Sequence, residues 1–246
     1  MKSDEERPAN AGATSAAAAQ LEPAEILESI DRRGFALTAP IVSDEDCGVL
    51  AALYDAGATF RSTVTMSRHG FGRGEYKYFA YPLPPLVAAL RRRIYVPLAP
   101  VANEWSRRLG WLADWPAGHA ELAARCSAAG QMRPTPLLLR YGAGDFNCLH
   151  QDLYGAIHFP LQAILLLDRP GVDFDGGELV LVEQRPRRQS TPIVVPLVSG
   201  AIAIVPVKER PAASARGYSR IQVRHGVSSL HRGLRRTLGL IFHDAA

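Results

Sequence analysis

The spacing of apolar residues changes character about halfway along the chain. Before Gln131, apolar residues recur at three- and four-residue intervals, which is typical of helices, over residues 23–34, 44–55, 84–110 and 119–130. After Gln131, short apolar runs of strand length follow one another, separated by turn-forming segments such as GAGD and DRPGVDFDGG. Helices followed by successive strands predict an α+β fold in which a helical layer packs on a β-sandwich or barrel.

The expected helix boundaries rest on particular residues. Gly34 and Gly130 are predicted to end the first and last helices, because glycine adopts the left-handed conformation at helix ends at little cost. Ser43 is predicted to cap the second helix, since acidic residues follow it in the first turn. We expect a break in the third helix at Pro97, because proline lacks the amide hydrogen that the helix needs.

The strands are expected to form one domain with the helices. A short strand is predicted over residues 35–43, and a strand, a loop and a second strand over residues 60–82. Residues 1–20 are polar and then alanine-rich, and they are predicted to be disordered. A single domain is expected over residues 21–246, with helical and lid elements over 21–130 and a β core over 131–246. The strands of the core are LLLRY, FPLQAILLL, GELVLVE, TPIVVPL, AIAIVPV, RIQVRH and TLGLIFH.

Composition and charge narrow the class of protein. The net charge of +4 and the pI of about 9.1 permit contact with nucleic acid or acidic surfaces but prove neither. No run of about 18 apolar residues occurs, so no membrane span is expected. The three widely spaced cysteines argue against a disulfide framework and against a cysteine-based zinc site. We therefore expect the protein to work in a reducing cytoplasm.

Two histidines and an aspartate carry the clearest candidate chemistry. His150 and Asp152 stand in CLHQDLYG, and side chains two positions apart in a strand point to the same face. His225 ends RIQVRH, where it shares a face with Ile221 and Val223 and is expected to point inward with them. Two histidines and one carboxylate with open coordination positions are typical of the facial triad of non-haem Fe(II) oxygenases.

Arg235 and Thr237 extend this candidate site. They share a face of the last strand with Ile241, and Leu238 and Leu240 take the other face. A buried arginine is unfavourable unless an anion pairs with it, and a ligand carboxylate could pair with this one in bidentate fashion. The candidate histidines His231 and His243 have no arginine ten residues further on, whereas His225 does.

Together these residues resemble the Fe(II)/2-oxoglutarate dioxygenase superfamily, whose pattern is His-x-Asp, a distant His and an Arg or Lys about ten residues later. The resemblance covers roughly residues 134–244. It implies a double-stranded β-helix (jelly roll) core, with iron bound by His150, Asp152 and His225. It further implies that the distal carboxylate of 2-oxoglutarate is bound by Arg235 with help from Thr237. Tyr141 and Asn147 are then the polar residues expected near the cosubstrate.

The same resemblance implies the reaction and its cofactors. Decarboxylation of 2-oxoglutarate in the presence of Fe(II) and O2 would be coupled to hydroxylation of a C–H bond, with ascorbate as a possible reductant. If the hydroxylated carbon is attached to nitrogen, the product breaks down and releases an aldehyde. The same site therefore suits hydroxylation or N-demethylation.

Residues 66–82 offer the best indication of the substrate. Arg68 and Arg73 are interleaved with aromatic residues that include Tyr76 and Tyr78, a composition that suits phosphate contact and base stacking. The alternative is a strand pair with aromatic residues in the core and a solvated turn. The run RPRRQS at residues 185–190 is a second basic patch, and a solvated loop is its default interpretation.

Three interpretations of the function follow. RYGAGDFNCLHQD resembles the AlkB-type nucleic-acid demethylases, although Ile241 stands where those enzymes carry a second arginine, and this favours demethylation of an alkylated base in single-stranded DNA or RNA. GGEL at residues 176–179 and the HGV run at 225–227 resemble prolyl and lysyl hydroxylase-like members, and this favours hydroxylation of a peptide side chain or a free amino acid. The third is a jelly-roll binding protein without catalysis.

Overall fold

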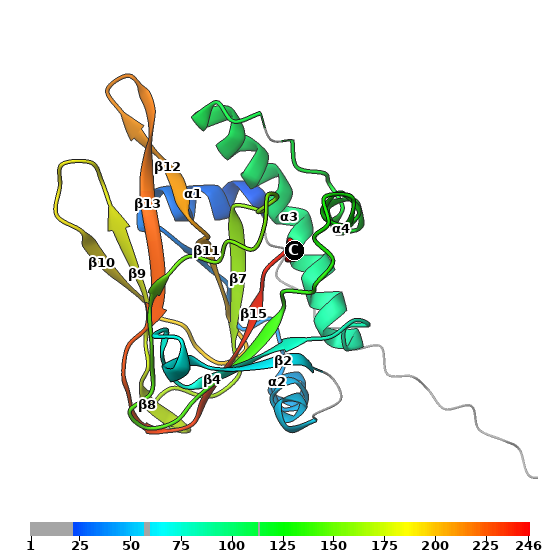
Figure 1. Ribbon diagram of the computed structural model, residues 1–246. Helices are drawn as coiled ribbons and strands as arrows, with labels where there is room; N and C mark the ends of the chain where they lie inside the picture. Colours follow the sequence, from blue (N-terminus) through cyan, green and yellow to red (C-terminus); the bar gives the residue numbers. More distant parts are fainter. Residues whose placement is uncertain (1–21, 57–59, 113) are drawn as a thin grey trace, which may run out of the picture.

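Three layers make up the part of the chain that the computed structural model describes, residues 22–56, 60–112 and 114–246. A seven-stranded sheet lies in the middle, a six-stranded sheet faces one of its sides, and helices pack on the other (Figure 1). This arrangement confirms the predicted α+β class. The predicted disordered tail at residues 1–20 lies outside the described residues.

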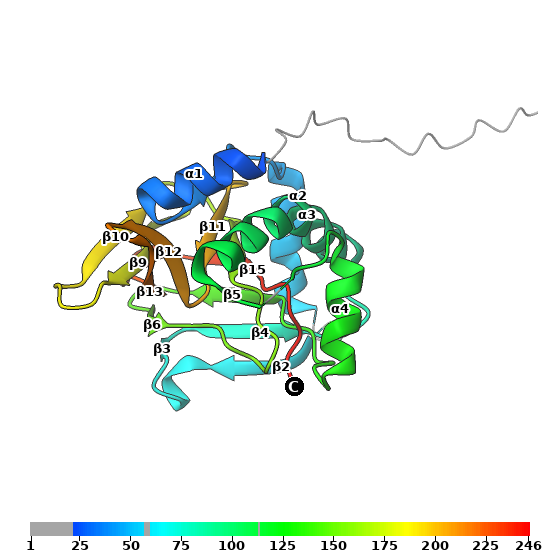
Figure 2. The same ribbon diagram turned by 90° about the horizontal axis from the view of Figure 1, so that it is seen from above.

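The helical layer contains four α-helices. α3 and α4 lie side by side (Figures 1 and 2). Gly34 ends α1 with a φ of 86°, and the side chain of Ser43 accepts a hydrogen bond from the amide of Asp46 at the start of α2, as predicted. Within the described ranges, no helix has the length and apolarity needed to cross a membrane. The helices are α1 (Pro23–Arg33), α2 (Asp44–Ala52), α3 (Pro85–Leu109) and α4 (His119–Ala128).

The predicted break in α3 at Pro97 was wrong, because the helix runs through both Pro97 and Pro100. Each proline removes the hydrogen bond to the carbonyl four residues earlier, at Arg93 and Val96. Both of these residues are exposed, so water can satisfy their carbonyl groups. The opposite face of the helix is buried and holds it together through Val87, Leu90, Ile94, Leu98, Val101, Ala102 and Trp105.

The strands form two main antiparallel sheets. The predicted core strands are all present, and β6, β8, β12 and β14 are additional to that list. The seven-stranded sheet has the order β1 (Ala36–Leu37), β11 (Ile202–Pro206), β7 (Leu161–Leu166), β15 (Arg235–Leu240), β5 (Leu137–Tyr141), β4 (Glu75–Phe79) and β2 (Phe60–Thr65). The six-stranded sheet has the order β10 (Thr191–Val195), β9 (Leu179–Gln184), β13 (Gly217–Val227), β6 (Phe146–His150) and β3 (Gly72–Arg73), with β12 (Glu209–Ser214) paired to β13. A third, two-stranded sheet joins β8 (Phe174–Gly176) to β14 (Leu230–Gly233).

Two hydrophobic cores separate the layers. One lies between the helices and the seven-stranded sheet, and it contains Leu238, Leu240 and Phe242. The other lies between the two sheets, and it contains Tyr141 and Val223. Because side chains alternate along a strand, the residues of β15 between the apolar ones point into the space between the sheets. The sequence pattern predicted this alternation, and it decides which residues can reach a site there.

A buried arginine ties α3 to the chain beyond β15. Arg91 is 1% exposed and donates hydrogen bonds to the carbonyls of Ile241 and Phe242 at 2.9 and 3.0 Å. It also forms an ion pair with Asp244, with 2.8 Å between Nη2 and Oδ1. The helical layer is thus fixed directly to the segment that follows the last strand.

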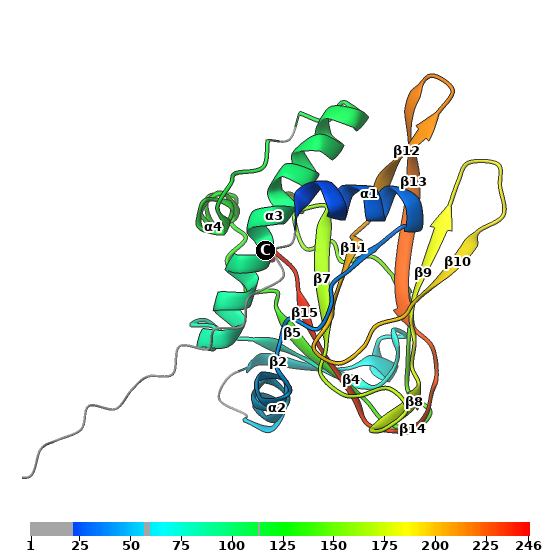
Figure 3. The same ribbon diagram turned by 180° about the vertical axis from the view of Figure 1, so that it is seen from behind.

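Two hairpins extend beyond the layers. The β9–β10 and β12–β13 hairpins project from the same side of the molecule, as Figures 1 and 3 both show. Both belong to the six-stranded sheet, so they are continuous with one wall of the space between the sheets.

Candidate active site

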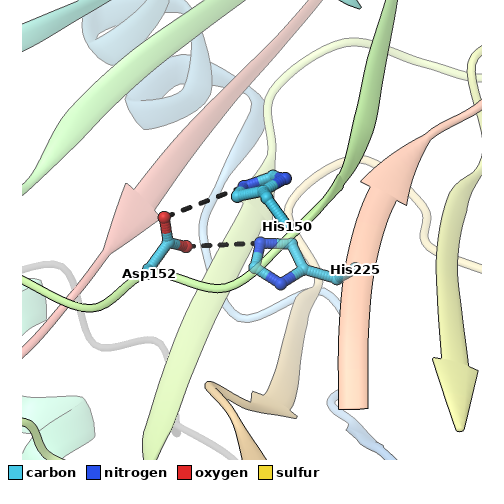
Figure 4. A group of neighbouring side chains, drawn as sticks. All are labelled: His150, Asp152 and His225. Carbon is cyan, nitrogen blue, oxygen red and sulfur yellow. Dashed lines mark ion pairs between the residues drawn. The ribbon is translucent and has the colours of Figure 1, made fainter. Parts of the chain in front are cut away.

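His150, Asp152 and His225 come together between the two sheets (Figure 4). His150 ends β6 and lies opposite His225 in the register of β13. One oxygen of Asp152 is 3.7 Å from Nε2 of His150, and the other is 3.3 Å from Nε2 of His225. One donor atom from each residue lies within 4.8 Å of the others, which is the arrangement that a single metal ion requires.

Asp152 lies outside the strand in which it was expected. β6 ends at His150, so strand alternation does not place Asp152. Asp152 follows in an irregular segment and still meets the histidines, because Tyr154 holds its carboxylate. The Tyr154 hydroxyl donates a hydrogen bond to Oδ1 of Asp152 at 2.7 Å and accepts one from the Tyr78 hydroxyl at 2.9 Å.

The hydrogen bonding of His150 presents a free nitrogen to the site. Nδ1 of His150 lies 2.8 Å from the carbonyl oxygen of Cys148, which can only accept, so Nδ1 carries the proton and Nε2 is left as a ligand. Burial and the nearby His225 lower the pKa of His150, which favours the neutral imidazole that metals bind. Burial alone would raise the pKa of Asp152, but its hydrogen bond and charge interactions with His225 outweigh burial and keep that pKa low.

Arg235 carries a buried positive charge that has no counterion in the described part of the chain. It is 2% exposed, and its Nε and Nη1 have no hydrogen-bond partner among the described residues. Its guanidinium carbon is 5.6 Å from the centre of the Tyr141 ring. Burial lowers the pKa of Arg235, which reflects the cost of a buried charge without a counterion. A ligand carboxylate would remove that cost, so the residues present fit a dicarboxylate cosubstrate.

A cavity of about 340 Å³ joins these groups, a volume that suits small ligands. The triad, Arg235, Thr237, Tyr141 and Asn147 all line it, and Nδ2 of Asn147 lies 3.3 Å from the Tyr141 hydroxyl. Of the four residues predicted to bind substrate, Tyr76 and Tyr78 line the cavity, whereas Arg68 and Arg73 do not. Arg73 is instead exposed and lies 4.0 Å from Asp145.

Tyr154 and Gln162 are polar residues that line this cavity and were not predicted from the sequence. Tyr154 stands two positions after Asp152, and its role is visible only from the hydrogen bond. Gln162 lies on β7 with its side-chain nitrogen 3.1 Å from Nε2 of His225. An amide within the otherwise apolar run LQAILL was a signal that could have identified Gln162.

Solved structures with the same fold include two prolyl hydroxylases. The prolyl-4-hydroxylase of Pseudomonas putida aligns with a TM-score of 0.51 and 14% identity, over 91% of this chain and 100% of that chain. The prolyl hydroxylase of Trichoplax adhaerens, solved with a peptide fragment of the hypoxia inducible factor oxygen degradation domain, aligns with a TM-score of 0.52 and 13% identity. That alignment covers 90% of this chain and 89% of that chain. These similarities confirm the double-stranded β-helix fold.

A His-Asp-His site inside a double-stranded β-helix is the arrangement typical of non-haem Fe(II) oxygenases. The chain belongs to the Oxygenase-NA family, whose model matches residues 74–245 and is described as "Oxygenase, catalysing oxidative methylation of damaged DNA". The His-Asp-His site fits Fe(II) as the cofactor, and the buried Arg235, without a counterion in the described ranges, fits 2-oxoglutarate as the cosubstrate. Membership of an oxygenase family identifies the protein as an enzyme rather than a non-catalytic binding protein.

A protein of Mycobacterium tuberculosis (strain CDC 1551 / Oshkosh), "Uncharacterized protein MT2286", shares most of this domain. It is 45% identical over 168 residues, which are 68% of this chain and 72% of the relative.

Proposed function

We propose that this enzyme removes methyl groups from nitrogen atoms of damaged nucleobases in DNA or RNA. Hydroxylation of such a methyl group yields a hydroxymethyl group, which leaves the nitrogen as formaldehyde. The observation that carries the proposal is that Tyr76 and Tyr78 share one cavity with the candidate iron ligands, in a family described as acting on damaged DNA. Aromatic side chains beside the reacting centre suit a base that has been drawn out of its stack.

Each residue of the site has a proposed role. His150, Asp152 and His225 hold the iron, which when bound supplies the activation of O2. Arg235 binds the distal carboxylate of 2-oxoglutarate, and the Thr237 hydroxyl, 2% exposed and on the same face of β15, adds a hydrogen bond.

Tyr141 and Asn147 complete the wall beside the cosubstrate. Their hydrogen bond joins β5 to β6 across the gap between the two sheets. Burial raises the pKa of Tyr141 to about 12, so its hydroxyl stays protonated and can donate to a ligand oxygen. These two residues therefore position the cosubstrate through neutral hydrogen-bonding groups.

Aromatic residues at the mouth of the cavity are proposed to hold the base. Phe71 lines the cavity, is 48% exposed and stacks on His69 with 5.3 Å between ring centres. Tyr76 and Tyr78 pack edge to face, 5.4 Å apart, further inside. A base stacked against these rings would displace water from the cavity. Arg68 and Arg73, outside the cavity and close to Phe71 in sequence, are proposed to contact the adjoining phosphates.

Mass spectrometry of N-methylated single-stranded oligonucleotides tests the proposal. The protein is incubated with Fe(II), 2-oxoglutarate and ascorbate, and Asp152→Ala serves as the control that lacks one proposed iron ligand. The expected result is loss of one methylene from the oligonucleotide together with formaldehyde and succinate, all absent with Asp152→Ala. Succinate production without any loss of methyl groups from the panel would refute the choice of substrate.

Hydroxylation of an amino-acid side chain is the second candidate. It is supported by the resemblance of the GGEL and HGV runs to prolyl and lysyl hydroxylase-like members. Gly177 of GGEL lies against Arg235, since a Cβ at Gly177 would be 3.0 Å from Cδ of Arg235. The same assay with proline-containing peptides and free amino acids would show the gain of one oxygen atom. That gain, with no change in the oligonucleotides, would establish this candidate instead.

A further inference from the structure

Basic residues are concentrated in one segment of the chain. Of its 28 lysines and arginines, eleven lie between Gln184 and His243, whereas only one of its 24 acidic residues, Glu209, lies there. This segment begins at the end of β9 and contains the β9–β10 loop, β10 and the β12–β13 hairpin. The two hairpins project from the same side of the molecule (Figures 1 and 3), and six of the eleven basic residues are exposed on them.

Six exposed arginines of these hairpins form what we call the arginine track. One part lies in the loop between β9 and β10, and the other begins at the turn between β12 and β13 and continues along β13. The register brings the two parts together, because Gln184 at the end of β9 pairs with Gln222 of β13. The β9–β10 loop thus begins at the level of Arg220. The track consists of Arg185, Arg187, Arg188, Arg216, Arg220 and Arg224.

The track runs along β13 on the outer face of the six-stranded sheet and ends at the level of the active site. Arg220 and Arg224 are exposed, whereas Ile221, Val223 and His225 are buried on the opposite face of the strand. Four residues of strand span roughly 13 Å, so Arg220 and Arg224 are about that far apart, and Arg216 lies in the turn just before the strand. Arg224 directly precedes His225, a proposed iron ligand.

The arginines of the track lack carboxylate partners. None of their side chains forms an ion pair or hydrogen bond within the described ranges, whereas Arg107, Arg125 and Arg169 on other surfaces are each paired. The buried pair of Arg210 and Glu183, 2.6 Å apart, neutralises the inner side of the same sheet. The exposed arginines therefore repel one another, and a bound polyanion would reduce that repulsion.

We propose that the arginine track binds the phosphate backbone of the nucleic-acid strand whose damaged base enters the cavity. A strand laid along the outer face of β13 would run from the hairpins to the level of His225. Its damaged base would reach the mouth of the cavity at Phe71 by passing round the β3 edge of the six-stranded sheet. Each phosphate neutralised would release counterions, which gives such binding a strong dependence on salt. The identity of the base rests on the proposed function, whereas phosphate binding does not depend on turnover.

Fluorescence anisotropy with a labelled single-stranded oligodeoxynucleotide tests the track over a range of salt concentrations. Arg216→Gln/Arg220→Gln and Arg187→Gln/Arg188→Gln each remove two charges of the track. Arg92→Gln/Arg93→Gln removes two exposed charges of α3 and is the matched control. Each track variant should bind more weakly and lower the slope of log K against log salt by about 1.4, that is, about 0.7 for each phosphate that the variant no longer neutralises.

The outcomes separate this proposal from the proposed function. If the track variants bind like the wild type, or no more weakly than the α3 control, the track is not the binding surface. Track-dependent binding of phosphatidylserine vesicles without binding of the oligonucleotide would assign the surface to a membrane and also refute it. A methylphosphonate oligomer of the same sequence, which is uncharged, should not compete. Track-dependent binding without demethylation would refute only the proposed function.

Discussion

At the scale of single residues, hydrogen bonds prepare the site for its ligands. The Cys148 carbonyl fixes the tautomer of His150, and the Tyr154 hydroxyl occupies one oxygen of Asp152. The other oxygen of Asp152 is left toward His225. Each ligand thus presents a defined lone pair to a metal ion, which lowers the cost of organising the site on binding.

Arg235 is expected to favour cosubstrate binding at the expense of stability. Arg235→Met should weaken 2-oxoglutarate binding to the Mn(II)-loaded protein by about 2–5 kcal/mol, the usual cost of removing one partner of a buried charge pair. Without 2-oxoglutarate the same variant should unfold at a higher temperature, because it no longer buries an unpaired charge. Calorimetric titration and thermal unfolding measure the two effects.

The variant Arg236→Met is the control for Arg235→Met. Arg236 pairs with Asp168 at 2.6 Å and belongs to the other face of β15, so Arg236→Met should lower stability and leave 2-oxoglutarate affinity unchanged. Unchanged affinity in Arg235→Met would contradict the role proposed for Arg235.

Tyr154→Phe should weaken metal binding. The variant keeps the ring and loses the 2.7 Å hydrogen bond to Asp152, and loss of a partner that orients a metal ligand typically costs about 10–100-fold in affinity. Tyr78→Phe removes a hydroxyl one step further from the metal and should have a smaller effect. Mn(II) titration followed by electron paramagnetic resonance gives both dissociation constants, and equal values for the wild type and Tyr154→Phe would disprove the effect.

The sequence predicted ligand types better than supporting interactions. His225 and Arg235 were found from strand alternation and spacing, because both properties depend on neighbouring residues in the chain. Tyr154 and Gln162 support their partners through hydrogen bonds that depend on how an irregular segment and a separate strand meet in space. The amide within LQAILL marks Gln162 as unusual, but no local pattern specifies which residue Gln162 or Tyr154 will contact.

At the scale of elements, α3 shows how tertiary packing overrides a local rule. Pro97 predicted a break, and the buried face of the helix together with the Arg91 network keeps the helix continuous. The loop after β6 shows the reverse case. The strand ends before Asp152, and a hydrogen bond from Tyr154 replaces the strand in fixing that residue.

Arg91→Met should destabilise the protein by about 3–5 kcal/mol, because it leaves the carboxylate of Asp244 buried without its charged partner. The carboxylate would keep the hydrogen bond from the Tyr81 hydroxyl at 2.7 Å, which does not neutralise its charge. The double variant Arg91→Met/Asp244→Asn should recover part of the loss, since it no longer buries a charge. Urea unfolding gives the free energies, and a double variant less stable than Arg91→Met would contradict this account.

At the scale of the whole molecule, buried histidines make stability depend on pH. Burial, assisted by the charge of Arg91, lowers the pKa of His119 to about 4, and its Nε2 donates to the Phe242 carbonyl at 2.9 Å. Between pH 6.5 and about 4 the unfolded chain binds a proton that the folded chain does not. The free energy of unfolding should therefore fall as the pH drops through this range, by at most about 1.4 kcal/mol per pH unit from this residue.

His119→Gln isolates this contribution. Glutamine can still donate to the carbonyl but does not titrate, so the variant should lose stability less steeply than the wild type between pH 6.5 and about pH 4. Chemical unfolding at several pH values compares the slopes. Parallel slopes would show that His119 does not cause the loss.

The sequence predicted the α+β class and the order of the helical and strand segments along the chain. The change from helical to strand periodicity after Gln131 separated the helical layer from the sheets. The pairing of β13 with both β6 and β9, which brings His225 opposite His150, joins strands far apart in sequence, and spacing alone does not specify it.

Because one face of β15 packs against the helical layer and the other lines the cavity, substitutions on the two faces have different consequences. Changes at Leu238 and Leu240 alter the packing of the helices, whereas changes at Thr237 and Gly239 alter the wall of the cavity. A family of such enzymes can therefore explore new substrates along one face of a strand while the other face preserves the fold. A saturation library across β15 would show fitness alternating with a period of two, with activity lost at one parity and expression lost at the other.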